Sequence, residues 1–93
     1  MRRKSKPDLN HGEIRDGLRA IIGKQLVYDC KDVGGGFPDL VVGFRGVNYF
    51  LEVKSNRKAT LTPAEEKFHS GWEGQIDIVY DLEEAMIVIG LPI

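Results

Sequence analysis

The chain has 93 residues, 42% hydrophobic and 29% charged, which indicates one ordinary globular domain without the run of about 20 apolar residues that a membrane span needs. One cysteine and two histidines argue against a disulfide framework and against a structural zinc site. The net charge of −1 conceals an asymmetry: residues 1–60 hold twelve Lys and Arg (all 13 except Lys67) against seven Asp and Glu, and residues 61–93 hold one against seven. A basic first part suits a polyanionic partner, and an ordinary solvated surface explains it equally well.

Residues 1–8 form a basic tail that we expect to be mobile, either as a nucleic-acid arm or as a solubilising terminus. Residues 9–93 then form a single domain. Helical spacing of apolar residues predicts a first helix that begins near Asn10, or alternatively at Asp8 after Pro7, and ends at Gly23. Asn10 and Glu13 fit a capping box, which would give Glu13 a structural role.

A first strand is predicted over Gln25–Cys30, followed by a loop over Lys31–Gly36 that contains three consecutive glycines. Such a run permits positive φ angles and close approach of the backbone to a ligand such as a phosphate. It is equally compatible with a flexible connector.

Two apolar runs, Leu40–Phe44 and Val47–Leu51, are separated by Arg45-Gly46 and predict a β-hairpin with a two-residue turn. Both runs are apolar on both faces, which favours a sheet covered on each side. This register pairs Asp39 with Glu52, and directly opposed residues share a face. Lys54 shares that face because side chains alternate along a strand.

The rest of the chain predicts a helix over Pro63–Ser70, a strand over Gln75–Tyr80 and a last helix over Leu82–Ile89 capped by Asp81. Thr62, Pro63 and Glu65 form a capping box with proline at the first helical position. The predicted order is αβββαβα, an α/β domain.

Two carboxylates that face each other destabilise a sheet unless a cation lies between them. Asp39 and Glu52 are therefore candidate ligands for Mg²⁺, which prefers oxygen donors and acidifies a bound water. The carbonyl of Val53 is a further candidate ligand, and Lys54 could orient the attacking water or act as its base. This set suits phosphodiester hydrolysis; a surface ion cluster is the plainer alternative.

Pro38-Asp39 followed by Glu52-Val53-Lys54 matches the pattern of the PD-(D/E)XK nucleases. The longer pattern, with GGGFPDL, then FLEVKS, then LTPAEEKFH, resembles the virus-type replication-repair nuclease (VRR-NUC) family over about residues 10–90. The resemblance implies a restriction-endonuclease-like core with a mixed central sheet flanked by helices. It assigns Asp39 and Glu52 to the metal and a catalytic role to Lys54. It also adds Glu13 of the first helix as a metal ligand and places Glu66 where the family often has Gln.

Small members of this family act as homodimers that resemble Holliday-junction resolvases. The resemblance therefore implies a cytoplasmic, Mg²⁺-dependent endonuclease for branched DNA, with Mn²⁺ as a substitute ion and no small-molecule cofactor. The alternatives are a nuclease for flaps, ends or linear duplexes, and a non-catalytic DNA-binding module.

Overall fold

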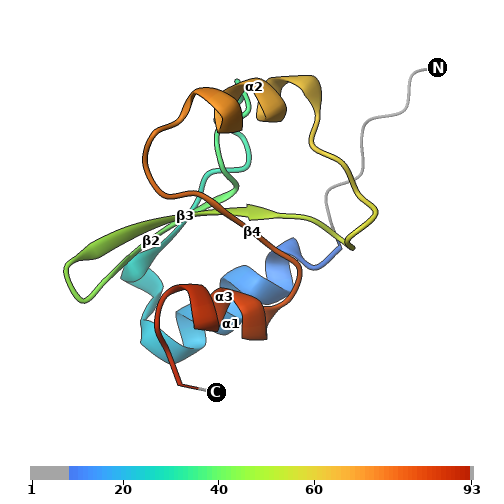
Figure 1. Ribbon diagram of the computed structural model, residues 1–93. Coiled ribbons are helices and arrows are strands. Elements are labelled where there is room, and N and C mark those ends of the chain that lie inside the picture. Colours follow the sequence, from blue (N-terminus) through green and yellow to red (C-terminus); the bar gives the residue numbers. More distant parts are fainter. Residues whose placement is uncertain (1–8, 93) are drawn as a thin grey trace.

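The computed structural model describes residues 9–92, and the predicted basic tail of residues 1–8 lies outside them. The described chain forms three α-helices and one four-stranded mixed sheet, which confirms the α/β class (Figure 1). In chain order the elements are α1 (His11–Ile22), the 3-10 turn η1 (Lys24–Leu26), β1 (Val27–Asp29), β2 (Leu40–Phe44), β3 (Val47–Val53), α2 (Pro63–Gly71), β4 (Asp77–Val79) and α3 (Leu82–Val88). None of the helices within residues 9–92 has the length and apolar content to cross a bilayer.

The hairpin of β2 and β3 has the predicted register. Leu40 pairs with Leu51 and Phe44 pairs with Val47, so Arg45 and Gly46 form the turn. Both turn residues have positive φ, 53° and 83°, as a two-residue turn of this kind requires. β1 adds antiparallel to β2 and β4 adds parallel to β3, which gives the strand order β1-β2-β3-β4.

The outer strands are shorter than the sequence predicts. β1 begins at Val27 because Lys24–Leu26 form the 3-10 turn instead of extended chain. β4 covers only Asp77–Val79 of the predicted Gln75–Tyr80. β3, in contrast, continues through Val53, so the strand extends past the predicted Leu51 and into the candidate site.

One face of the sheet carries the hydrophobic core. α1 and α3 lie together on this side in Figure 1, and α2 lies on the opposite side. The core is built from fully buried aliphatic residues of both helices and all four strands: Ile14, Leu18, Val27, Leu40, Val42, Leu51, Val53, Val79, Ala85 and Ile89. Burial of a Val, Leu or Ile side chain contributes about 1.5–3 kcal/mol each, so this layer supplies most of the stability.

The other face is only partly covered, which corrects the expectation of a sheet buried on both sides. α2 has no buried residue and lies on the sheet through a cluster of four aromatic rings. The Trp72 ring stacks on those of Phe50 and Phe68, each 5.1 Å between centroids, and Phe37 contacts both Phe50 and Phe68. Tyr28, at 66% exposure, remains open to solvent on this side. One helix of nine residues is too short to cover the whole face.

The start of α1 also differs from the expectation. Asn10 is the N-cap residue, but its side chain makes no capping hydrogen bond. Instead its amide nitrogen donates to the carbonyls of Lys54 at 2.8 Å and Tyr80 at 2.7 Å. The predicted capping box with Glu13 is therefore wrong, because the Asn10 side chain ties the helix start to the ends of β3 and β4.

Gly36 fixes the glycine loop to the first turn of α2. Its φ is 81°, and a Cβ built there would lie 2.2 Å from the carbonyl oxygen of Ala64. We expect Gly36→Ala to destabilise the protein by about 3 kcal/mol or more, because backbone strain and a backbone clash combine. Gly35→Ala is the matched control, since Gly35 also has positive φ but open space around it. Thermal unfolding of both variants checks this, and equal losses would exclude the contact with α2 as the cause.

Candidate functional site

Three charged residues gather where the hairpin ends, on the face of the sheet toward α2. Asp39 directly precedes β2, Glu52 lies in β3, and Lys54 directly follows β3. The side chain of Glu52 is 1% exposed and that of Lys54 is 8% exposed. Lys54 Nζ lies 3.9 Å from Glu52 Oε2. The structure thus brings together the residues that the strand register predicts.

Asp39 is held by the neighbouring strand. Its Oδ2 accepts a hydrogen bond of 2.9 Å from the backbone N–H of Val53, and its carbonyl accepts one of 2.7 Å from the N–H of Cys30. Continued by two residues, the register of β2 and β3 places Pro38 opposite Val53. Proline has no N–H, so β2 offers no donor to the Val53 carbonyl. This geometry fits the predicted role of that carbonyl as a ligand.

α2 contributes two residues that the sequence reasoning did not assign to the site. Glu65 forms the predicted capping box with Thr62, and its Oε1 also accepts a hydrogen bond of 2.7 Å from Lys54 Nζ. His69 lies one helical turn later, with Nε2 3.6 Å from Glu52 Oε1. Their spacing of four residues puts both on one helix face, and this spacing is the signal that could have identified them.

Burial, and then the neighbouring carboxylates, strongly disfavour ionisation of Glu52. Burial, together with the carboxylates of Asp39 and Glu65, raises the pKa of Glu52 to about 10. Burial also acts to raise the pKa of Glu65, but hydrogen bonds from Lys54 and the Thr62 N–H outweigh it and lower that pKa. Burial lowers the pKa of His69. A cation beside Glu52 would reverse the balance there and stabilise the carboxylate.

One feature of the cluster suits a divalent cation, but its side chains could fill only part of the coordination sphere of the ion. Both carboxylate oxygens of Glu52 are buried and have no hydrogen-bond partner within the described part of the chain. An unpartnered buried carboxylate is costly, and a cation would satisfy it. No three His, Cys, Asp or Glu side chains among residues 9–92 form a ready metal cage. Mg²⁺ commonly binds one or two carboxylates and retains several waters, which agrees with the small donor set of Asp39, Glu52 and the Val53 carbonyl.

The structure does not bring Glu13 or Glu66 into this cluster. Glu13 is exposed on α1, because the buried stripe of that helix consists of His11, Ile14 and Leu18. Glu66 is exposed on α2 while the preceding residue, Glu65, turns toward Lys54. Neither Glu13 nor Glu66 makes a side-chain hydrogen bond or an ion pair with another of residues 9–92. Their assignments stay predictions without a supporting contact.

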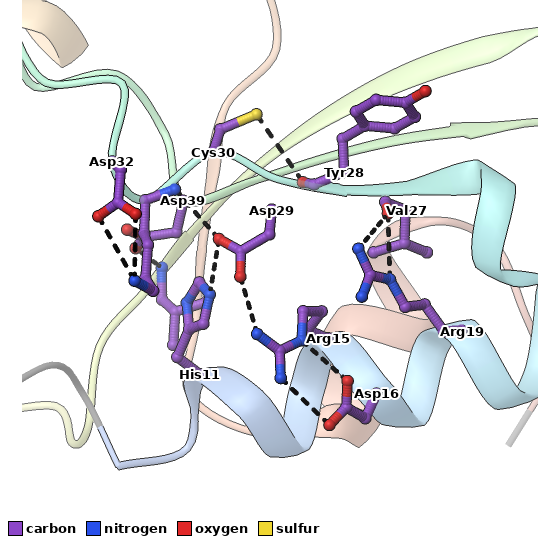
Figure 2. A network of polar contacts seen from close by, with 12 residues as sticks. His11, Arg15, Asp16, Arg19, Val27, Tyr28, Asp29, Cys30, Asp32 and Asp39 are labelled. Atoms are coloured by element: carbon purple, nitrogen blue, oxygen red, sulfur yellow. Dashed lines mark hydrogen bonds and ion pairs between the residues drawn. The ribbon is translucent and has the colours of Figure 1, made fainter.

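A second polar network joins α1 to β1 beside Asp39. Figure 2 shows Asp29 between two residues of the helix, with Oδ1 3.1 Å from His11 Nε2 and Oδ2 2.8 Å from Arg15 Nη1. Burial of Asp29 opposes its ionisation, but these contacts and the Lys31 N–H lower its pKa to about 2. Asp29 is therefore charged at neutral pH and anchors the helix to the strand next to the site.

Comparisons of the chain with protein-family models, with curated proteins and with solved structures gave no match. The functional assignment therefore depends on the residues of this chain and on their geometry.

Proposed function

We propose that the protein is a metal-dependent endonuclease that hydrolyses phosphodiester bonds in DNA. The observation that carries this proposal is the carboxylate of Glu52, which is buried, has no hydrogen-bond partner among the described residues and is flanked by Asp39 and Lys54. A protein that only bound DNA would gain nothing from a buried carboxylate near phosphates. The motif resemblance to the VRR-NUC family, with its restriction-endonuclease-like core, supports the same reading.

In this proposal Asp39, Glu52 and the carbonyl of Val53 hold Mg²⁺, or Mn²⁺ in its place. The ion would supply an acidified water and neutralise charge on the phosphate. Lys54 Nζ would donate hydrogen bonds to the attacking water and to the phosphate oxygens as negative charge grows on them. Glu65 would keep the Lys54 ammonium charged and aimed at the cluster, since it accepts a 2.7 Å hydrogen bond from it.

The overall reaction consumes one water. The water oxygen bonds to phosphorus, the bond from phosphorus to the leaving ester oxygen breaks, and the leaving oxygen takes up a proton. The basic loop Ser55–Lys58 follows Lys54 directly and would bind neighbouring phosphates. Four-way junctions are the proposed substrate, cut by a homodimer whose two-fold symmetry matches two cleavage sites. A chain this small also gains stability by burying apolar area against a second copy.

The test is incubation of the purified protein with labelled four-way junction, flap, single-stranded and linear duplex DNA, with and without Mg²⁺ or Mn²⁺. We expect metal-dependent cleavage, fastest on the junction. Faster cleavage of flaps or linear duplexes would replace the junction assignment and keep the nuclease. No cleavage of any substrate would overturn the nuclease itself. Light scattering at micromolar concentration tests the dimer, and a single 10.4 kDa species would contradict it.

A further inference from the structure

His69 presents a buried nitrogen to Glu52, the most buried carboxylate among residues 9–92. Its Nε2 and the Oε1 of Glu52 are 3.6 Å apart, and each is a buried atom without a hydrogen-bond partner among residues 9–92. The Glu52 side chain is 1% exposed and that of His69 is 15% exposed. Water is therefore not freely available to either atom, and both need another partner.

These two atoms are too far apart for a direct hydrogen bond, and they are close enough to become ligands of one ion. A nitrogen and an oxygen joined by a hydrogen bond lie roughly 2.7–3.2 Å apart, which is shorter than the distance here. Two adjacent ligands of an octahedral ion, each about 2.1 Å from it, lie about 3.0 Å apart, so a bound ion would draw these two atoms together by a few tenths of an ångström. Lys54 Nζ approaches the other oxygen, Oε2, at 3.9 Å, whereas Oε1 is buried and, of the two ion-pair partners of Glu52, lies nearer to the His69 nitrogen.

We infer that the imidazole of His69 is a ligand of the cation that Glu52 holds and that it shifts the preference of the site from Mg²⁺ toward Mn²⁺ and Co²⁺. Mg²⁺ favours oxygen ligands and dehydrates reluctantly, whereas imidazole nitrogen suits transition ions. The inference rests on the proposed function only in requiring a cation at Glu52. α2, which contributes His69 to the cluster, would thereby influence which metal ion binds there.

Calorimetric titration of the wild type with Mg²⁺, Mn²⁺ and Co²⁺, without DNA, tests this inference. We expect Mn²⁺ and Co²⁺ to bind more tightly than Mg²⁺. His69→Gln replaces the imidazole nitrogen by an amide oxygen. It should weaken Co²⁺ and Mn²⁺ binding about tenfold or more, because the loss of even a residue that contacts a metal ligand costs about tenfold in metal affinity. Mg²⁺ binding should change little. Ser70→Ala, an exposed neighbour on the same helix, is the matched control.

Two further variants separate failure of this inference from failure of the site. If Glu52→Gln binds all three ions as well as the wild type, Glu52 holds no cation and the proposed nuclease site fails with it. If Glu52→Gln loses the ions while His69→Gln keeps the wild-type ratio of Mn²⁺ to Mg²⁺ affinity, only the role of His69 is overturned. Circular dichroism of each variant shows that it is folded, and His69→Asn provides a second oxygen-donor variant if His69→Gln is not.

Discussion

Glu52→Gln should make the metal-free protein more stable than the wild type at pH 8 and abolish the proposed nuclease activity. In the folded protein the pKa of Glu52 is raised from 4.5 to about 10, whereas the unfolded chain has the ordinary value. Between these values the unfolded chain releases a proton that the folded protein retains. Unfolding is therefore favoured as pH rises, and wild-type stability falls across this window. Glutamine has no proton to release, so the variant avoids the loss, which we expect to be about 1–3 kcal/mol at pH 8.

Unfolding by urea at pH 5 and pH 8 measures this effect. The stability difference between variant and wild type should be larger at pH 8, and saturating Mg²⁺ should restore the wild type but not the variant. Cleavage should fall on the order of a hundredfold or more. Glu73→Gln makes the same chemical change at an exposed position and should alter neither property. A Glu52→Gln variant that is less stable at pH 8, or that still cuts DNA, contradicts the assignment.

Lys54→Met should abolish cleavage and leave DNA binding nearly intact. The side chain is 8% exposed and its ammonium donates to Glu65 at 2.7 Å, beside the carboxylate of Glu52. Methionine matches the length of lysine but carries no charge, so the donor that would face the attacking water is lost. In the proposed complex, DNA binding would be carried mainly by contacts of other basic residues with the phosphates. Cleavage at saturating DNA, together with binding by gel shift in Ca²⁺ or without metal, separates the two effects.

The substitution also leaves the Glu65 carboxylate without its cationic partner. This should lower the free energy of unfolding by about 3 kcal/mol, because removing one partner of a buried ion pair has a cost of that size. The double variant Lys54→Met with Glu65→Gln also removes the negative charge of Glu65. It should recover most of the lost stability but none of the DNA cleavage. Lys67→Met makes the same chemical change at an exposed position of α2 and serves as the control. Cleavage by the double variant at the wild-type rate would exclude a catalytic role for Lys54.

The hairpin and its charged residues were predictable because their geometry is local. A two-residue turn at Arg45-Gly46 leaves one register for β2 and β3, and the alternation of side chains then places Asp39, Glu52 and Lys54 on one face. The helix starts with the strongest local signal were also predictable. Thr62 and Glu65 form their capping box, since both partners lie within one turn.

What the sequence did not reveal depends on contacts between distant segments. The Asn10 amide reaches the carbonyls of Lys54 and Tyr80, 44 and 70 residues away, and no local pattern reports such partners. Glu65 was assigned to capping alone, although one carboxylate oxygen serves both Thr62 and Lys54. Alternation along a strand shows that a face is apolar, but not how much of it a single short helix can cover.

The lack of buried residues on α2 has a consequence for partial unfolding of the protein. α2 places no residue in the core, while α1, the sheet and α3 with its C-cap residue Ile89 supply the buried aliphatic cluster. A fluctuation that lifts α2 would break aromatic contacts and the Lys54–Glu65 bond but leave the core intact. Partial unfolding of this kind would hydrate Glu52 and allow it to ionise. Entry of the proposed cation and detachment of α2 would then be one coupled event, while the rest of the fold keeps its structure.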